Sequence, residues 1–239
     1  MFSKKSSASD ASPAILNQSI TARTAPFGVY ILFLALAGAL TAWFTSLGLD
    51  ARWIYALRVA TVALLLLLFA KSYHELNWSQ ARLDFRSWLL SIAFGVIVFL
   101  LWILPWPHWA VMQSDGAGFS PLRADSSLDS LQAAIRWSGA ALVVPVMEEL
   151  FWRSFLLRWI KNQDFLNVDP AKVGWFAFVV VAVLFGLEHS LWLAGLLAGV
   201  AYNGLYMLRK TLWAPIVAHA VTNAMLGIWV IQTGNWQYW

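Results

Sequence analysis

The chain has 239 residues, of which 60% are apolar and only 12% are charged, and its formal net charge is +4. A mean hydropathy of +0.65 excludes an ordinary water-soluble domain, in which about a quarter of the residues are charged. The sequence contains no cysteine, which excludes disulfides, thiol nucleophiles and thiolate metal sites. The composition therefore predicts a protein embedded in a lipid bilayer.

Seven apolar stretches are each about as long as a helix needs to cross roughly 30 Å of hydrocarbon. They lie at residues 27–44, 53–70, 88–105, 139–160, 173–189, 191–208 and 212–232. Since the connections between them are short, the sequence predicts an all-α, polytopic transmembrane bundle of about seven spans, with a single membrane domain over 27–232. The polar, Ser-rich stretch 1–26 is expected to be a disordered cytoplasmic tail, and 233–239 a short outer tail.

Basic residues orient the spans, because Lys and Arg are retained on the cytoplasmic side of a membrane. Alternate loops place eleven of them on one side: Lys4, Lys5, Arg23, Lys71, Arg82, Arg86, Arg158, Lys161, Lys172, Arg209 and Lys210. The other side holds only Arg52 and Arg123. This bias predicts a cytoplasmic N-terminus and an outer C-terminus, and it explains the net charge without a nucleic-acid partner.

Charged residues inside the spans need an explanation, because each costs about 3 kcal/mol at the centre of a transmembrane helix. All eight aspartates lie outside the spans, whereas three of the four glutamates, Glu148, Glu149 and Glu188, lie within them. Glu149 and Arg153 are four residues apart, so an α-helix would let them form a buried ion pair. Glu148 points about 100° away from Glu149. It is left without that partner and is the first candidate for a functional role.

Two further polar pairs follow at a spacing of four residues. "FGLEH" holds Phe185 and His189, and "HAVTN" holds His219 and Asn223. At 1.5 Å per residue from the cytoplasmic ends, Glu148 and Asn223 lie about 18 Å deep, His219 about 12 Å and His189 about 24 Å. A carboxylate, two imidazoles and a carboxamide at similar depth could deprotonate water and donate hydrogen bonds to an oxyanion. For either histidine alone, an interhelical hydrogen bond is the competing interpretation.

The motifs "EELFWR", "FGLEH" and "HAVTN", in this order within residues 139–232, resemble the three signatures of the CAAX prenyl protease and bacteriocin-processing (CPBP) family of membrane proteases. The resemblance implies a glutamic-type intramembrane endopeptidase that acts on a membrane-associated protein or peptide. The tryptophan-rich variant, with 16 tryptophans, further resembles the bacterial branch associated with exosortase and sorting-tail systems. That branch implies the bacterial inner membrane and a sorting-system partner.

The resemblance also implies a role for each residue that matches the motifs. Glu148 and His189 would activate water, while His219 and Asn223 would stabilise the oxyanion. The residues expected to support the site are Glu149, Arg153 and Phe185, with the first two holding the arrangement and Phe185 packing beneath His189. We expect no cofactor and no metal.

Two alternatives stay open at this point. Glu148, His189 and His219 match the ligand types of a catalytic zinc site, although the sequence has no H-E-x-x-H. A protein of another class, a non-catalytic membrane immunity factor or scaffold that binds a hydrophobic peptide, would use the same polar cluster structurally. In every case lipid surrounds the chain.

Overall fold

The computed structural model describes residues 13–77, 84–112 and 119–239. Within these ranges the chain is helical and has no β-strand, apart from one isolated bridge between Leu122 and Leu128. The α-helices are α1 (Pro13–Ala35), α2 (Ala37–Ser46), α3 (Trp53–Leu68), α4 (Phe85–Trp102), α5 (Ser130–Ser138), α6 (Val144–Glu149), α7 (Leu157–Trp159), α8 (Trp175–Leu187), α9 (Trp192–Arg209) and α10 (Trp213–Thr233). The all-α fold class is confirmed.

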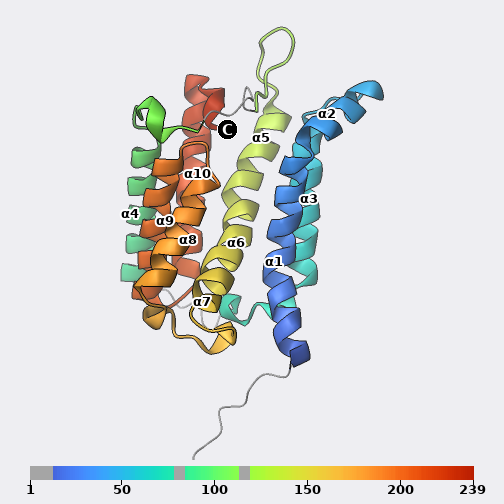
Figure 1. The fold of residues 1–239 in the computed structure, drawn as a ribbon. Coiled ribbons are helices and arrows are strands. Elements are labelled where there is room, and N and C mark those ends of the chain that lie inside the picture. Colours follow the sequence, from blue (N-terminus) through green and yellow to red (C-terminus); the bar gives the residue numbers. More distant parts are fainter. Residues whose placement is uncertain (1–12, 78–83, 113–118) are drawn as a thin grey trace, which may run out of the picture.

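Two π-helical segments, Gly139–Val143 and Leu150–Leu156, join α5, α6 and α7 into one continuous rod. Figure 1 shows this rod between the α1–α3 pair and a group formed by α4, α8, α9 and α10. The start of α1 and the C-terminus lie at opposite ends of the bundle. The rod therefore contributes side chains to the interior that both groups of helices enclose.

Helices α4 and α10 approach each other closely at Gly95. A Cβ atom built at this position would lie 2.5 Å from the carbonyl oxygen of Ala218, so any larger residue would push the helices apart. The hydroxyl of Thr222 donates a hydrogen bond to the Gly95 carbonyl across 2.9 Å. This contact fixes the depth of α10, the helix that carries two of the expected site residues.

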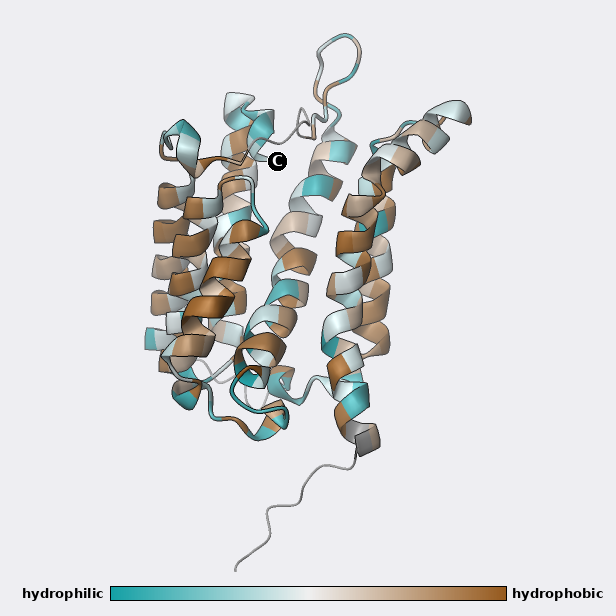
Figure 2. Cartoon of the chain, viewed as in Figure 1, coloured by the Kyte–Doolittle hydropathy of each residue, from teal (hydrophilic) through white to brown (hydrophobic). Residues whose placement is uncertain are grey.

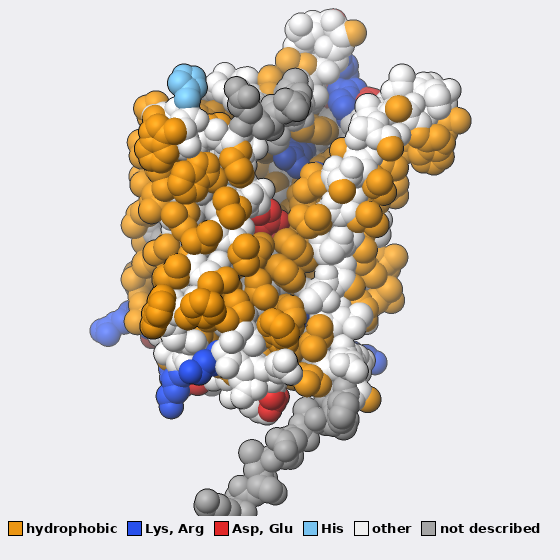
Figure 3. All heavy atoms as spheres, viewed as in Figure 1, with side chains coloured by type: hydrophobic (Ala, Val, Ile, Leu, Met, Phe, Trp, Pro, Cys, Tyr) orange, Lys and Arg blue, Asp and Glu red, His pale blue; other side chains and the backbone are white. Residues whose placement is uncertain are grey.

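The outer surface suits lipid. Large apolar side chains are exposed on several helices, among them Leu67 on α3 and Trp175 at the start of α8. Figure 2 shows hydrophobic residues along the helices and hydrophilic ones gathered in many of the connections, and orange side chains cover most of the face in Figure 3. A surface of this kind would be unstable in water, so the protein is a membrane protein.

In the part of the chain that the structure describes, fewer helices than the seven predicted spans are long and apolar enough to cross a membrane. Among the described residues, α4 and α10 are long and apolar enough to cross a membrane by length and composition, and the α1–α2 pair, bent by 62°, could form a third span. Helices α3 and α8 are apolar but shorter. The seven-span topology stays a prediction.

The N-terminal boundary differs from the one expected. Residues 1–12 of the expected tail lie outside the described ranges, but α1 begins at Pro13, so residues 13–26 are helical rather than disordered. The reason is Arg23, which sequence reasoning placed among the cytoplasmic charges. Its side chain is 1% exposed and forms an ion pair with Glu75 across 2.6 Å. A buried partner of this kind orders the helix that carries it.

The Arg23–Glu75 pair belongs to a junction of three segments. Ser154 and Arg158 from the rod join it: the Arg23 Nε donates to the Ser154 hydroxyl across 2.9 Å, and that hydroxyl donates to the Glu75 carboxylate. Arg158 Nη2 donates to Ser154 Oγ across 2.8 Å. Burial alone would raise the pKa of the Glu75 carboxyl, but the Arg23 guanidinium and the hydrogen bonds hold it below its ordinary value.

The C-terminal residues also differ from a simple outer tail. Helix α10 ends at Thr233, and the chain then turns through a short 3-10 helix, Trp236–Tyr238. The rings of Tyr238 and Trp229 meet edge to face with centroids 5.3 Å apart. The end of the described chain thus packs back onto α10.

Candidate active site

The two adjacent glutamates lie at the end of α6, between the two π-helical segments of the rod. Glu148 is 4% exposed and Glu149 is fully buried. A π-helical turn holds an extra residue and so changes the direction in which the following side chains point, and such turns occur often at functional sites. Together with their burial, this placement makes the glutamates the natural centre of a site.

The first π-helical segment leaves one backbone carbonyl for a side chain on another helix. Val144 N–H donates to the carbonyl of Gly139 in the π register, and the next donor in that register would be residue 145. Pro145 has no N–H. The carbonyl of Ala140 instead accepts a hydrogen bond from Nδ2 of Asn223 on α10, across 2.9 Å. The proline thereby links the rod to α10 at the level of the site.

A single oxygen of Glu149 organises the charged side of the site. Oε1 accepts a hydrogen bond from Nη1 of Arg153 across 3.0 Å, so the expected buried ion pair is confirmed. The same oxygen lies 2.9 Å from Nδ1 of His219. Because an ionised carboxylate only accepts, Nδ1 carries a proton. The Nε2 atom of His219 then faces Glu148, 4.0 Å from Oε2.

Arg153 has further contacts that sequence reasoning did not anticipate. Its Nε donates to Oδ1 of Asn203 on α9 across 3.1 Å, and Nδ2 of Asn203 donates to the carbonyl of Phe178. Its guanidinium carbon also lies 4.4 Å from the centroid of the Phe185 ring. Asn203 is the one fully buried asparagine among the described residues, and an amide inside an apolar helix was the signal that could have found it.

His189 lies in the turn that follows α8, two residues beyond the end of the helix at Leu187. The span expected at residues 173–189 included His189, but the helix ends two residues before it. The His189 ring nevertheless contacts Phe185: its Nδ1 lies 2.8 Å from the Phe185 carbonyl oxygen, and the two ring centroids are 4.9 Å apart. A carbonyl can only accept, so Nδ1 is the donor and Nε2 is left as an acceptor.

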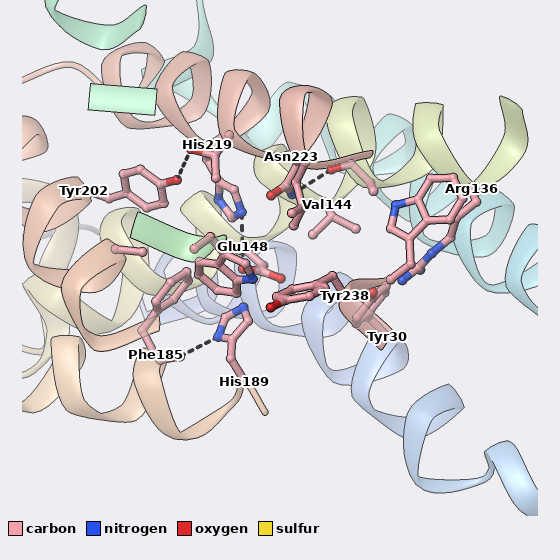
Figure 4. A pocket seen from close by; sticks show the side chains of 16 residues that line it. Tyr30, Arg136, Val144, Glu148, Phe185, His189, Tyr202, His219, Asn223 and Tyr238 are labelled. Carbon is pink, nitrogen blue, oxygen red and sulfur yellow. Dashed lines mark hydrogen bonds and ion pairs between the residues drawn. The ribbon is translucent and has the colours of Figure 1, made fainter. Parts of the chain in front are cut away.

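The four expected catalytic residues, Glu148, His189, His219 and Asn223, line one cavity of about 160 Å³ (Figure 4). Sequence reasoning missed several of its other lining residues, namely Tyr30, Trp102, Arg136, Tyr202, Tyr238 and Trp239. The Tyr202 ring stacks on the His219 ring with centroids 5.1 Å apart and holds it in place. Nothing in the sequence distinguished these aromatic residues from the many that anchor spans in a bilayer.

A metal site needs three suitable side chains close together. In the described part of the chain, no group of three or more His, Asp or Glu side chains is arranged to hold a metal ion. Glu148 and Asn223 keep hydrogen-bonding capacity toward the cavity, since Glu148 Oε2 has no partner in the described ranges and the Asn223 amide has a second hydrogen. The arrangement can therefore accept a proton and donate to an oxygen.

Comparison with known families relates part of the chain to a described family. No curated protein and no solved structure matches the chain. Residues 130–225 match the family model of type II CAAX prenyl endopeptidase Rce1-like proteins. This segment holds the rod, α8, α9 and the part of α10 that carries His219 and Asn223. Over this segment the chain is similar to the Rce1-like type II CAAX prenyl endopeptidases, and the similarity supports a CAAX-type protease of the membrane.

Proposed function

We propose that the protein hydrolyses a peptide bond of a membrane-associated protein or peptide with a water molecule activated by Glu148. One observation carries this proposal: Oε2 of Glu148 is buried, has no hydrogen-bond partner among the described residues, and belongs to a side chain that lines the same cavity as His189, His219 and Asn223. A buried carboxylate oxygen without a partner is costly. That cost is offset if the oxygen holds a water.

The space beside Glu148 suits such a water. The 4.0 Å between Glu148 Oε2 and His219 Nε2 is too long for a direct hydrogen bond, so Oε2 can accept a hydrogen bond from a water in the cavity. His189 Nε2, left as an acceptor by the bond at Nδ1, can hold the second hydrogen of the water. These contacts would point a lone pair of the water into the cavity.

The reaction then proceeds in two balanced steps. Glu148 takes a proton from the water as the oxygen forms a bond to the peptide carbonyl carbon, and the carbonyl oxygen becomes an oxyanion. The C–N bond breaks as the oxyanion re-forms a carbonyl, and Glu148 returns the proton to the leaving nitrogen. No oxidant or further reactant is needed, and the glutamate ends as it began.

The oxyanion would be stabilised from α10. Asn223 Nδ2 uses one hydrogen for the Ala140 carbonyl, so its second hydrogen is free to donate. His219 can donate from Nε2 only when its ring carries both protons, and Glu149 is placed to stabilise that cation through Nδ1. The nearby charges of Glu149 and Arg153 offset each other, so a cationic His219 opposite an anionic Glu148 leaves the site close to neutral.

The topology completes the proposal. We place the protein in a bacterial inner membrane, with the N-terminus in the cytoplasm and the site within the bilayer, and we assign it a partner from an exosortase-type sorting system. The basic residues of alternate loops and the sequence resemblance support this assignment.

The decisive experiment compares the termini of membrane proteins in cells that make the wild-type protein, Glu148→Gln or Glu188→Gln. Glu188 is the matched control, because it is a partly buried glutamate that accepts a hydrogen bond from Trp152 Nε1 across 3.1 Å. New termini should appear with the wild-type protein and Glu188→Gln and be missing with Glu148→Gln. If Glu148→Gln leaves every terminus unchanged while it still binds peptide, the protein is a non-catalytic immunity or scaffold protein.

A further inference from the structure

Two arginines near the cavity have no counter-ion in the part of the chain that the structure describes. Arg58 on α3 and Arg136 on α5 form no ion pair with any carboxylate in the described ranges. The Nε atom of each is buried and has no hydrogen-bond partner among those residues. The fully buried arginines Arg23 and Arg153, in contrast, both pair with a glutamate. An unpaired, half-buried guanidinium is costly unless something else neutralises it.

Aromatic rings hold the two cations without neutralising them. The Arg58 guanidinium carbon lies 4.5 Å from the Tyr30 ring centroid and 5.0 Å from that of Tyr55, and the Arg136 carbon lies 4.4 Å from the Tyr55 centroid. Gly139 makes room for this ring, because a Cβ atom there would lie 2.6 Å from the Tyr55 hydroxyl. Cation–π contacts stabilise each charge, yet two like charges that share a ring repel each other.

This cationic pair adjoins the catalytic cavity. Arg136 and Tyr30 line the same cavity as Glu148, and Figure 4 shows Arg136 at the end opposite His189, with Tyr30 and Tyr238 between. In Figure 3 a Lys or Arg side chain and an acidic side chain are both visible in the hollow between the helix groups. Arg136 precedes Glu148 by twelve residues, or about 18 Å along a helix.

We propose that Arg136, assisted by Arg58, binds a carboxylate of the peptide substrate. The proposal rests on the peptidase function proposed above. An extended peptide rises about 3.3 Å per residue, so after allowance for the length of the arginine side chain the carboxylate lies on the order of four residues from the scissile bond. A planar guanidinium suits a carboxylate because it can donate two parallel hydrogen bonds. A peptide is favoured over a lipid headgroup because Arg136 lines the cavity that Glu148 lines.

Binding can be tested without catalysis. The full-length Glu148→Gln protein, in phosphatidylcholine nanodiscs, is titrated with a fluorescent apolar decapeptide in three forms: the free acid, the C-terminal amide, and the amide with one Asp. At least one carboxylate form should bind on the order of tenfold more tightly than the neutral amide, as expected for a charge-assisted pair. The free acid and the Asp form distinguish a terminal from a side-chain carboxylate.

Arginine variants assign the preference. In the Glu148→Gln background, Arg136→Gln should abolish the preference for a carboxylate, and Arg58→Gln should reduce it. Arg123→Gln is the matched control, since Arg123 is exposed and lies 3.6 Å from Asp129, and it should keep the full preference. Arg136→Lys retains the positive charge and should keep part of the preference for a carboxylate. It provides the test if Arg136→Gln does not fold.

Several outcomes would overturn the proposal. They are equal binding of all three peptides, or a preference for a carboxylate that survives in folded Arg136→Gln. Stabilisation of the wild-type protein by phosphatidylglycerol alone, lost in Arg136→Gln, would assign the pair to a lipid instead. If the protein cleaves peptides but binds the carboxylate forms no more tightly, only the proposed carboxylate subsite is refuted. If it prefers the carboxylate forms but cleaves nothing, only the proposed peptidase function is refuted.

Discussion

Glu149 and His219 are 70 residues apart in the chain, and their side chains meet across 2.9 Å inside the bundle. The glutamate next to the proposed base therefore orients the histidine that faces that base. Arg153 shares the same carboxylate oxygen, so loss of Glu149 would affect both partners at once.

Replacing Glu149 should thus harm stability where replacing Glu148 does not. Glu149→Gln leaves Arg153 buried without a counter-ion, which costs about 3–5 kcal/mol for a fully buried pair. Its Tm in detergent should fall clearly below that of the wild type, whereas Glu148→Gln should keep the wild-type Tm and lose cleavage. Thermal unfolding and a cleavage assay on both variants check this, and an exchange of the two phenotypes would reverse the roles.

The hydrogen bond between Asn223 and Ala140 can be separated from catalysis. Asn223→Ala should slow cleavage about a hundredfold, because removal of one oxyanion donor costs about 3 kcal/mol in the barrier. It should also lower the Tm, since the Ala140 carbonyl loses its partner. Adding Pro145→Ala supplies a backbone N–H for that carbonyl.

The double variant is the informative one. We expect Asn223→Ala/Pro145→Ala to regain much of the lost Tm and none of the lost rate. Recovery of the rate together with the Tm would mean that Asn223 acts only as a structural link between the rod and α10.

Metal dependence distinguishes a glutamate-activated water from zinc. Protein purified without added metal should contain well under one zinc per chain and should keep its activity after prolonged chelation. Metal analysis and assays before and after chelation are the measurements. Stoichiometric zinc, with a loss of activity that added zinc reverses, would show that Glu148, His189 and His219 are ligands instead.

The Arg23–Glu75 junction predicts a loss of stability in acid. The folded-state pKa of Glu75 lies below its ordinary value of 4.5, so on acidification the unfolded chain takes up this proton first. The contribution is complete above about pH 5 and is lost as the pH falls through the folded-state pKa. The wild-type Tm should therefore drop more steeply between pH 5 and about pH 3 than the Tm of Glu75→Gln.

The same titration has an internal control. In Arg23→Gln the largest opposing charge is gone, so the burial that raises the pKa of Glu75 is less opposed and the acid slope should shrink. A slope in Glu75→Gln as steep as that of the wild type would show that other groups cause the acid sensitivity.

Orientation in the membrane can be read from single cysteines, because the chain has none of its own. Gln163, in the connection after α7, and Gln237, in the C-terminal turn, are both exposed. Gln163→Cys should react with an impermeant maleimide only from the cytoplasmic side, and Gln237→Cys only from outside. Reaction of both from the same side would refute the predicted orientation.

The helical class and the approximate positions of most helices could be predicted from the sequence, because lipid imposes long apolar stretches that composition reveals directly. The Glu149–Arg153 pair was predictable for a similar reason, since a spacing of four residues places side chains together on a helix. Both the helices and this ion pair depend on residues close together in the sequence, so the sequence alone was enough to predict them.

Contacts between distant segments were not predictable. Nothing local to Arg23 indicates that its partner is Glu75, so a buried arginine was taken for a loop charge. Pro145 leaves the Ala140 carbonyl without a backbone donor only because the helix there has π hydrogen bonding, which residue propensities do not predict. The role of Asn203 follows from its hydrogen bond with Arg153 of the rod, a contact between distant segments. The unpaired state of Arg136 is visible only once the neighbouring helices are placed.

The ion pair between Arg23 and Glu75 also bears on how the protein is made. Arg23 emerges from the ribosome 52 residues before its partner, a delay of roughly 3–10 seconds at synthesis rates of about 5–20 residues per second. Throughout that interval its guanidinium has no carboxylate of its own junction and must stay solvated. We therefore expect α1 to reach its final depth only after α3 and the turn that carries Glu75 have been synthesised. Helices α1 to α3 would then insert into the bilayer together.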